Sequence, residues 1–139
     1  MIKYLIDTNV LSELRRATPA NARLHEWAAS VDPLDSAVSV ISLMELEYGA
    51  KSVRSKDPAF AARLTNWIAS TIRPTYEGRL LAVDEIVASR CATLIASRSQ
   101  HLSDALIAAT ALAHRLTVIT RNVRHFEPMG VPILNPWTA

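Results

Sequence analysis

Residues 1–11 read MIKYLIDTNVL, and the rest of the chain is organised around this stretch. An apolar run that favours β structure, from Ile2 to Ile6, stops at the carboxylate of Asp7. From Asn9 to Arg16 the apolar residues recur at helical spacing, so the pattern predicts a buried strand that leads into a helix. Ligands of open α/β sheets bind beyond the carboxyl ends of the strands. Asp7 is therefore a candidate functional residue, although Asp is also a preferred N-cap at the start of a helix.

The composition is that of a compact globular domain. The chain has 139 residues, of which 50% are hydrophobic and 20% are charged. A chain of this size can bury a sizeable core without metals or disulfides as structural supports, so we expect a single domain over residues 1–139. The formal net charge is only +2, which permits a polyanionic partner without demanding one.

The cysteine content and the apolar runs bear on the compartment. Cys91 is the only cysteine, so the sequence holds no disulfide framework. The N-terminus lacks the long apolar region of a signal peptide, and the longest apolar stretch, residues 105–113, is shorter than the roughly 20 residues that cross a bilayer. We expect a cytoplasmic protein that does not associate with a membrane.

Strands and helices alternate along the rest of the chain. Helices are predicted from Thr18 to Ser30, Ser42 to Ala50, Asp57 to Ile72, Glu85 to Arg98 and Asp104 to His114, and strands over residues 34–40, 80–83, 116–120 and 131–134. Pro74 is expected to close the third helix, residues 100–102 to link the fourth helix to the fifth, and residues 121–130 to form a loop. The alternation predicts an α/β fold with a mostly parallel central sheet flanked by helices on both faces. Pro132 indicates an edge position for the last strand.

Three carboxylates occupy comparable positions along the chain. Asp7 follows the first strand, Glu45 lies in the first turn of a later helix, and Asp104 starts the helix before the strongest strand. Asp7 and Asp104 are also good N-caps, although Ser103 competes with Asp104 for that role. Glu45 completes a capping box with Ser42. Capping explains each carboxylate alone, but it does not explain why a parallel sheet would gather all three at one edge.

A metal ion would account for such a gathering. Carboxylates in one crevice repel one another and lose hydration, which is costly unless a hard divalent cation neutralises them. Mg²⁺ or Mn²⁺ suits an all-oxygen site, whereas the scattered histidines do not resemble zinc ligands. These histidines are His25, His101, His114 and His125. A site of this kind suits the hydrolysis of phosphodiesters, because the metal orients water and stabilises the transition state.

Five short segments form a series along the sequence. They are residues 5–10 (LIDTNV), 42–46 (SLMEL), 104–111 (DALIAATA), 120–126 (TRNVRHF) and 135–137 (NPW). Taken together and in this order, the segments resemble the PIN-domain toxins of type II toxin-antitoxin modules, and the VapC/FitB-like group is the nearest type. The similarity covers essentially the whole chain, and the combination is specific although each motif alone is weak.

The resemblance implies a PIN fold and a Mg²⁺- or Mn²⁺-dependent endoribonuclease that a cognate antitoxin holds inactive. Carried over by position, it makes Asp7, Glu45 and Asp104 the acidic metal ligands and catalytic residues. Thr8 or Asn9 would help to position metal, water or phosphate. Family members usually form homodimers, and the antitoxin commonly inserts a peptide beside the active site. Such complexes often bind their own operator DNA, mainly through the antitoxin.

The chain departs from the family pattern after the strand at residues 116–120. Many PIN domains have a fourth acid there, but this chain has Asn122 at the nearest matching position and His125 where relatives often carry an acid. Asn122 stays among the catalytic candidates because its neutral oxygen can bind a metal or a water, although with less attraction than a carboxylate. Asn is also frequent at loop positions with unusual backbone angles. The choice between one and two metals therefore stays open.

The expected reaction is metal-assisted hydrolysis of RNA, without an obvious general base among the side chains. Arg121 or another basic residue near the crevice would receive the substrate backbone, so binding or cleavage should weaken as salt rises. One alternative is a catalytically weak PIN protein that acts mainly as a binding partner in an antitoxin–operator DNA complex, which the missing fourth acid favours. Another is a phosphatase that forms an aspartyl-phosphate at Asp7. That chemistry needs an acid two residues later, where the chain has Asn9.

Overall fold

The computed structural model describes residues 1–97 and 101–139. In these residues five strands form one sheet in the order β3-β2-β1-β4-β5. The strands are β1 (Tyr4–Ile6), β2 (Ser36–Ser39), β3 (Leu80–Leu81), β4 (Thr117–Ile119) and β5 (Ile133–Leu134). All four pairings are parallel, which confirms the predicted α/β class. β5 lies at an edge of the sheet, as Pro132 indicated.

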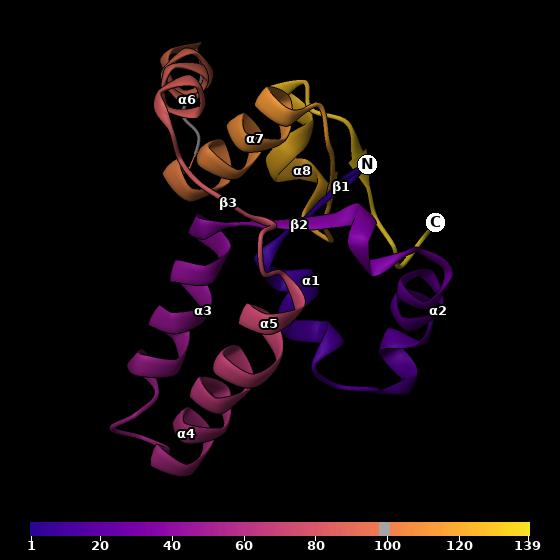
Figure 1. The fold of residues 1–139 in the computed structure, drawn as a ribbon, viewed down its shortest axis with the longest axis vertical. Helices are drawn as coiled ribbons and strands as arrows, with labels where there is room; N and C mark the ends of the chain where they lie inside the picture. The colour runs from indigo at the N-terminus through magenta and orange to yellow at the C-terminus, as the bar shows by residue number, and fades with distance from the viewer. Residues whose placement is uncertain (98–100) are drawn as a thin grey trace.

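Helices cover both faces of the sheet (Figure 1). One face carries α1 (Thr8–Leu14), α2 (Ala22–Ser30), α3 (Val40–Ser52), α4 (Pro58–Trp67) and α5 (Arg73–Thr75), and the other carries α6 (Glu85–Ser97), α7 (Leu102–His114) and α8 (Val123–Phe126). Short 3-10 turns are η1 (Pro19–Asn21), η2 (Pro33–Asp35) and η4 (Glu127–Met129), and η3 (Ile68–Ile72) is a π-helical segment between α4 and α5. The predicted arrangement of helices on both faces is confirmed.

Each strand contributes to two hydrophobic cores, because successive side chains of a strand point to opposite faces of the sheet. Leu5 of β1 belongs to the cluster with α6, α7 and α8, whereas its neighbour Ile6 belongs to the cluster with α1, α2, α3 and η3. Val118 and Ile119 of β4 divide between the clusters in the same way. The sheet is therefore a buried middle layer, which explains why its strands are almost continuously apolar.

The carboxyl ends of the strands meet at one edge of this layer. The backbone N–H of Asp7, just after β1, donates to the carbonyl of Ile119 at 2.9 Å, and the N–H of Thr120, just after β4, donates to the carbonyl of Leu134 at 3.1 Å. Ser39 ends β2 and caps α3. The chain thus places a polar residue at the end of each of three neighbouring strands.

The predicted strand over residues 34–40 is too long. The Asp32 carboxylate accepts the N–H of Leu34 at 2.9 Å and starts the turn η2, so β2 begins only at Ser36. At its other end, Val40 already belongs to α3. The predicted strands at residues 80–83, 116–120 and 131–134 are likewise shorter, as the bounds of β3, β4 and β5 show. Apolar residues continue past each strand, so composition alone does not mark where pairing stops.

Two further predictions about the connections are wrong. Residues 121–130 are not a simple loop, because they contain α8 and η4. Pro74 does not close the helix that Asp57 caps, since the chain passes through η3 and continues as α5. Pro has no N–H to donate, and it is tolerated here because it lies in the first turn of α5.

The helix predicted from Thr18 begins as η1, and the side chain of Thr18 makes no capping hydrogen bond. Asp84 caps α6 by accepting the N–H of Val87 at 2.9 Å. Arg98, the predicted end of that helix, and Gln100, the first residue of the predicted link, lie outside the described residues. The predicted link runs one residue too far, because Leu102 already begins α7. In residues 1–97 and 101–139 there is no helix whose length and apolar character would allow it to cross a bilayer.

Candidate active site

Asp7 is the centre of the polar edge and is only 3% exposed. It caps α1 by accepting the N–H of Thr8 on Oδ1 at 2.8 Å. Its other oxygen, Oδ2, accepts the hydroxyl of Thr120 at 2.7 Å and the side-chain Nδ2–H of Asn9 at 3.2 Å. The capping prediction is therefore confirmed, and the cap engages only Oδ1, because Oδ2 contacts Thr120 from the segment after β4 and Asn9 from α1.

The pKa of Asp7 is raised from an ordinary 3.8 to about 6. Burial is the largest cause, because it penalises the charged form. The hydrogen bonds from Thr120 and Thr8 lower the pKa, whereas the negative charges of Asp104 and Glu45 raise it further. Asp104 and Glu45 thus both lie close enough to Asp7 to repel its charge, in agreement with the expectation that the fold gathers the three carboxylates at one edge.

Glu45 reaches this edge from α3. Its Oε1 accepts the hydroxyl of Thr8 at 2.6 Å, and the same hydroxyl lies 2.9 Å from Oγ of the buried Ser42. The predicted capping box is wrong, because α3 starts one turn earlier and its N-cap is Ser39, which accepts the N–H of Ile41. Ser42 and Glu45 therefore lie inside the helix, and their side chains contact Thr8 instead of capping.

Asp104 lies in the first turn of α7, opposite α8. Neither Asp104 nor Ser103 is the N-cap, because α7 begins at Leu102 and His101 occupies the cap position. Oδ2 of Asp104 lies 3.0 Å from Nδ1 of His125 in α8. The rings of His101 and His125 are 5.9 Å apart, so these two histidines are not scattered as the sequence suggested.

Asn122 is the N-cap residue of α8, and its exposed side chain makes no capping hydrogen bond. Its backbone N–H donates to Oγ1 of Thr120 at 2.9 Å. The backbone of Asn122 is thereby tied to the residue that contacts Asp7, while its amide group is not held by the cap. Its role as a catalytic residue stays a prediction.

The donor set at this edge suits a hard cation. It consists of carboxylate, hydroxyl and amide oxygens, which Mg²⁺ and Mn²⁺ prefer over nitrogen and sulfur ligands. Among the residues that the structure describes, no three His, Cys, Asp or Glu side chains are grouped tightly enough to hold an ion directly. Mg²⁺ usually keeps several of its waters and binds proteins through one or two carboxylates. The site therefore fits an ion that is bound partly through water.

The structure adds residues to the site that the sequence did not single out. Thr120 donates to Asp7, Ser42 supports Thr8, and His125 contacts Asp104. The sequence could have indicated Thr120 by its position alone, because it is the polar residue that directly follows β4, just as Asp7 directly follows β1. His125 was noted only as a replacement for an acid.

A groove opens beside Thr8 and Glu45. It runs between α1, α3 and α4, with an apolar floor and a basic rim. Its lining includes Arg15, Arg16, Leu46, Phe60, Leu64, Trp67 and Ile68. The guanidinium groups of Arg15 and Arg63 both lie over the Phe60 ring, with their Cζ atoms 5.4 and 5.5 Å from its centroid. The groove is thus continuous with the candidate active site.

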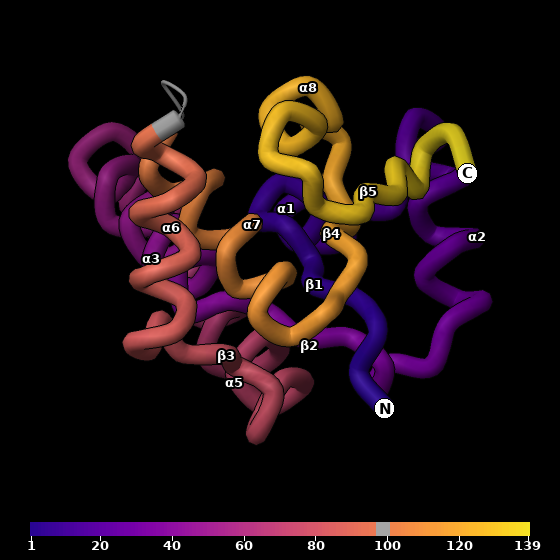
Figure 2. Tube along the Cα trace, turned by 90° about the horizontal axis from the view of Figure 1, so that it is seen from above, coloured from indigo at the N-terminus to yellow at the C-terminus, as the bar shows by residue number. Residues whose placement is uncertain are grey.

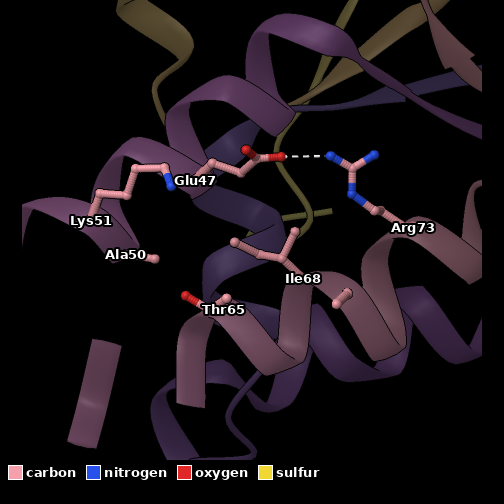
Figure 3. A pocket seen from close by; sticks show the side chains of 7 residues that line it. Glu47, Ala50, Lys51, Thr65, Ile68 and Arg73 are labelled. Carbon is pink, nitrogen blue, oxygen red and sulfur yellow. Dashed lines mark hydrogen bonds and ion pairs between the residues drawn. The ribbon is translucent and has the colours of Figure 1, made fainter. Parts of the chain in front are cut away.

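A second pocket lies between α3 and the α4–η3 segment and is separate from the carboxylates. Figure 3 shows Glu47 and Arg73 facing each other across it, with Nη2 of Arg73 2.7 Å from Oε1 of Glu47. Lys51, Thr65 and Ile68 line the same pocket. The ion pair already engages the carboxylate and the guanidinium that line this pocket. The pocket includes none of the three candidate carboxylates, so it does not compete with them as the candidate active site.

Comparison with known proteins identifies the family of this chain. The family model described as "PIN domain" matches residues 4–130, so the chain belongs to the PIN domain family. The chain is 36% identical to toxin FitB of Neisseria gonorrhoeae over 96% of this chain and 97% of FitB. It is 34% identical to VapC ribonuclease Y4jK of Sinorhizobium fredii over 96% of each chain.

Solved structures agree with these relatives. FitAcB from Neisseria gonorrhoeae matches with a TM-score of 0.83 and 34% identity over 98% of this chain and 99% of that chain. FitAB bound to an IR36 DNA fragment matches with a TM-score of 0.81 and 31% identity over 96% of this chain and 95% of that chain. The resemblance to PIN-domain toxins of the FitB and VapC type is confirmed.

Proposed function

We propose that the chain is the toxin of a type II toxin-antitoxin module and that it hydrolyses RNA with Mg²⁺ or Mn²⁺ at Asp7, Glu45 and Asp104. The observation that carries this proposal is the buried Asp7 carboxylate, whose pKa is raised to about 6 by burial and then by Asp104 and Glu45. Such mutual repulsion is costly without a cation. The relative named VapC ribonuclease supports RNA as the substrate.

Asp7, Glu45 and Asp104 would hold the ion partly through its waters. When bound, the ion would activate water for attack on phosphorus and offset the charge of the transition state. Hydrogen bonds fix the positions of two carboxylates before the ion binds. Asp7 accepts the hydroxyl of Thr120 and the backbone N–H of Thr8, and Glu45 accepts the hydroxyl of Thr8. Asn122 would add a neutral oxygen ligand, or hold a water, at the position where many PIN domains have a fourth acid.

A cognate antitoxin is the proposed partner. The structures named FitAcB and FitAB support this, and the FitAB complex is bound to DNA. We place the inhibitory segment of the antitoxin in the groove between α1, α3 and α4, because its apolar floor and the guanidinium groups of Arg15 and Arg16 suit a peptide with apolar and acidic side chains. Operator DNA would then be bound mainly through the antitoxin.

A homodimer in the cytoplasm completes the proposal. Met44 is 53% exposed and Tyr48 is 72% exposed on neighbouring turns of α3, beside Val40 and Leu43. A second copy would remove this apolar surface from water. Light scattering of the chain and of Tyr48→Asp would test it, since a dimer through this face should dissociate in the variant. The single buried thiol, Cys91, is compatible with a reducing compartment.

The deciding experiment is cleavage of a mixed pool of single-stranded RNA by the antitoxin-free protein with Mg²⁺, with Mn²⁺ and with chelator. Asp7→Asn is the test variant, and Asp35→Asn is its matched control. The Asp35 carboxylate forms an ion pair with Lys3 at 3.7 Å, and Asp35 lies at the opposite end of β1 and β2. We expect cutting that requires metal, disappears in Asp7→Asn and persists in Asp35→Asn.

Other outcomes of the same experiment separate the alternatives. No cutting across a wide RNA panel by folded protein with metal present would contradict the nuclease and favour the binding-partner function. Cutting that continues in chelator would contradict the metal requirement. A covalent phosphate trapped on Asp7 would instead support the phosphatase.

A further inference from the structure

Residues 135–137, the sequence NPW, have no part in the proposed chemistry, yet they are firmly tied into the fold. Oδ1 of Asn135 accepts the backbone N–H of Trp137 at 2.9 Å, and Pro136 is buried. After β5 this turn brings the end of the chain beside α2, as both views show (Figures 1 and 2). The turn therefore fixes where the Trp137 indole lies.

The indole forms a platform for Arg121. The Cζ atom of Arg121 lies 3.8 Å from the centroid of the Trp137 ring, so the guanidinium is stacked on the ring. Trp is the strongest partner for such cation–π contacts. The carbonyl of Trp137 is also 3.4 Å from Nη1 of Arg23. Trp137 thus contacts two arginines, one through its ring and one through its backbone.

Asn21 joins the ring and the guanidinium. Its Oδ1 accepts the indole N–H of Trp137 at 3.2 Å and the Nη2 group of Arg121 at 3.5 Å. Its Nδ2 donates to the Glu13 carboxylate at 2.8 Å. Asn21 is only 2% exposed, and these partners fix which end of its amide faces Arg121. The Arg121 side chain is therefore held from two sides.

Arg121 is adjacent to the acidic edge. It follows Thr120, the residue that donates to Asp7, and its own N–H donates to Oδ1 of Asn9 at 3.4 Å. Its side chain is exposed, and none of the ion pairs found in the described residues includes Arg121. The site thus holds one positive group that is immobilised without a carboxylate partner.

From this arrangement we infer that Arg121 binds a phosphate of the RNA beside the scissile bond, and that Trp137 and Asn21 are positioning residues that hold its guanidinium there. The inference rests on the proposed ribonuclease function. It also assigns a function to residues 135–137, because the turn that they form holds the Trp137 ring on which the Arg121 guanidinium is stacked.

The geometry suits this task better than a mobile surface arginine would. A guanidinium presents a planar fork of donors that matches phosphate oxygens. Stacking on the ring leaves its in-plane N–H groups available, apart from the one at Nη2 that Asn21 accepts. A side chain that is already immobilised loses less conformational entropy when RNA binds. A carboxylate partner would cancel the charge, whereas an indole ring and a neutral amide hold the group without neutralising it.

The test measures RNA affinity against salt in the non-cleaving Asp7→Asn background, with a labelled single-stranded RNA. Each phosphate contact contributes about 0.7 to the slope of log affinity against log salt for single strands. Arg121→Gln should reduce the slope by about 0.7. Arg115→Gln is the matched control, since Arg115 is an exposed arginine at the far end of β4, at the C-cap of α7, and its slope should not change.

Variants of Trp137 separate positioning from a structural role. Trp137→Leu keeps the charge of Arg121 but removes the ring on which its guanidinium is stacked, so it should reduce the slope as Arg121→Gln does. The double variant, Arg121→Gln with Trp137→Leu, should bind RNA no more weakly than Arg121→Gln alone. Trp137→Phe keeps a stacking ring and should keep most of the slope. A purely structural role would lower the melting temperature in Trp137→Leu and leave the slope unchanged, which would overturn the inference.

Arg121→Lys supplies a measurement that does not depend on the folding of a Trp137 variant. A lysine keeps the charge but neither stacks nor forks, so it should weaken binding roughly fivefold and lower the slope as Trp137→Leu does. Equal affinity in Arg121→Lys and the parent would overturn the stacked fork. If the unmodified chain neither binds nor cuts RNA, the proposed function itself fails. If it cuts RNA and Arg121→Gln keeps the parent slope, only this inference fails.

Discussion

The Thr120 hydroxyl donates a hydrogen bond to Oδ2 of Asp7 at 2.7 Å and joins two residues that are 113 positions apart. The pairing of β1 with β4 brings them together, because each residue directly follows its strand. Oγ1 of Thr120 also accepts the N–H of Asn122 at 2.9 Å, so its single proton is committed to Asp7. This hydrogen bond lowers the pKa of Asp7 and so opposes the effect of burial.

Thr120→Val should therefore raise the pKa of Asp7 further. A hydrogen bond to a charged group is worth about 1.5–3 kcal/mol, and one pKa unit corresponds to about 1.4 kcal/mol. We expect the acid limb of the pH–cleavage profile to move up by about one unit. Thr117→Val is the control, because Thr117 begins the same strand at its other end, and its profile should match that of the parent. An unmoved limb in Thr120→Val would contradict the role of the hydroxyl.

The raised pKa of Asp7 also predicts how stability changes with pH in metal-free protein. The folded state has a pKa of about 6 and the ordinary value is 3.8, so the folded state holds the proton more tightly than the unfolded chain. The free energy of unfolding should then fall as pH rises through this window, with the full penalty present above about pH 6. Asn cannot ionise, so Asp7→Asn escapes this penalty.

Urea unfolding in chelator would measure the effect in the parent and in Asp7→Asn. The stability of Asp7→Asn relative to the parent should increase by about 2 kcal/mol between about pH 4.5 and about pH 7.5. The same comparison for Asp35→Asn should show no such increase. A constant difference between Asp7→Asn and the parent across this range would mean that the pKa of Asp7 is not raised.

The architecture could be predicted from the sequence because its signals are local and repeated. Apolar β runs end at caps such as Asp7 and Asp84, and both caps are present in the structure. The start of α3 was misplaced because Ser39 and Ser42 are three residues apart and each fits a cap pattern, while pairing of β2 as far as Ser39 decides between them. The four-residue helix α8 is too short to show a helical period in the sequence.

The candidate site was predictable in its acids but not in its supporting groups. A carboxylate at the carboxyl end of a predicted strand lies where ligands of α/β sheets bind, so Asp7 could be noticed from its position. A hydroxyl such as Thr120 or Ser42 is common everywhere, and its role depends on partners more than 30 residues away, as the Thr8–Ser42 contact shows. The contact of His125 with Asp104 likewise depends on how α7 and α8 pack.

The Thr8 hydroxyl is predicted to hold Glu45 in place. Thr8→Val has nearly the same shape but leaves Oε1 of Glu45 without its 2.6 Å donor and removes the partner of buried Ser42. We expect cleavage to fall about tenfold and the free energy of unfolding to fall by about 1–2 kcal/mol. Thr8→Ser keeps the hydroxyl and should restore most of the cleavage. Equal loss in both variants would show that the methyl group matters instead.

Asn122→Asp is predicted to strengthen metal binding, because it adds a carboxylate at the exposed start of α8. The backbone of residue 122 is linked to Asp7 through the hydroxyl of Thr120. The rise in melting temperature with Mg²⁺ should then be half complete at about fivefold lower Mg²⁺ than in the parent. Asn66→Asp makes the same charge change on the exposed surface of α4 and serves as the control. Identical Mg²⁺ responses in both variants would exclude the position from the metal site. If the parent cuts RNA, Asn122→Asp should lower the Mg²⁺ concentration that cutting requires, because an extra negative ligand attracts the cation more strongly. If the parent is silent and Asn122→Asp cuts, the missing fourth acid is what separates this chain from an active nuclease, and its natural role is that of a binding partner.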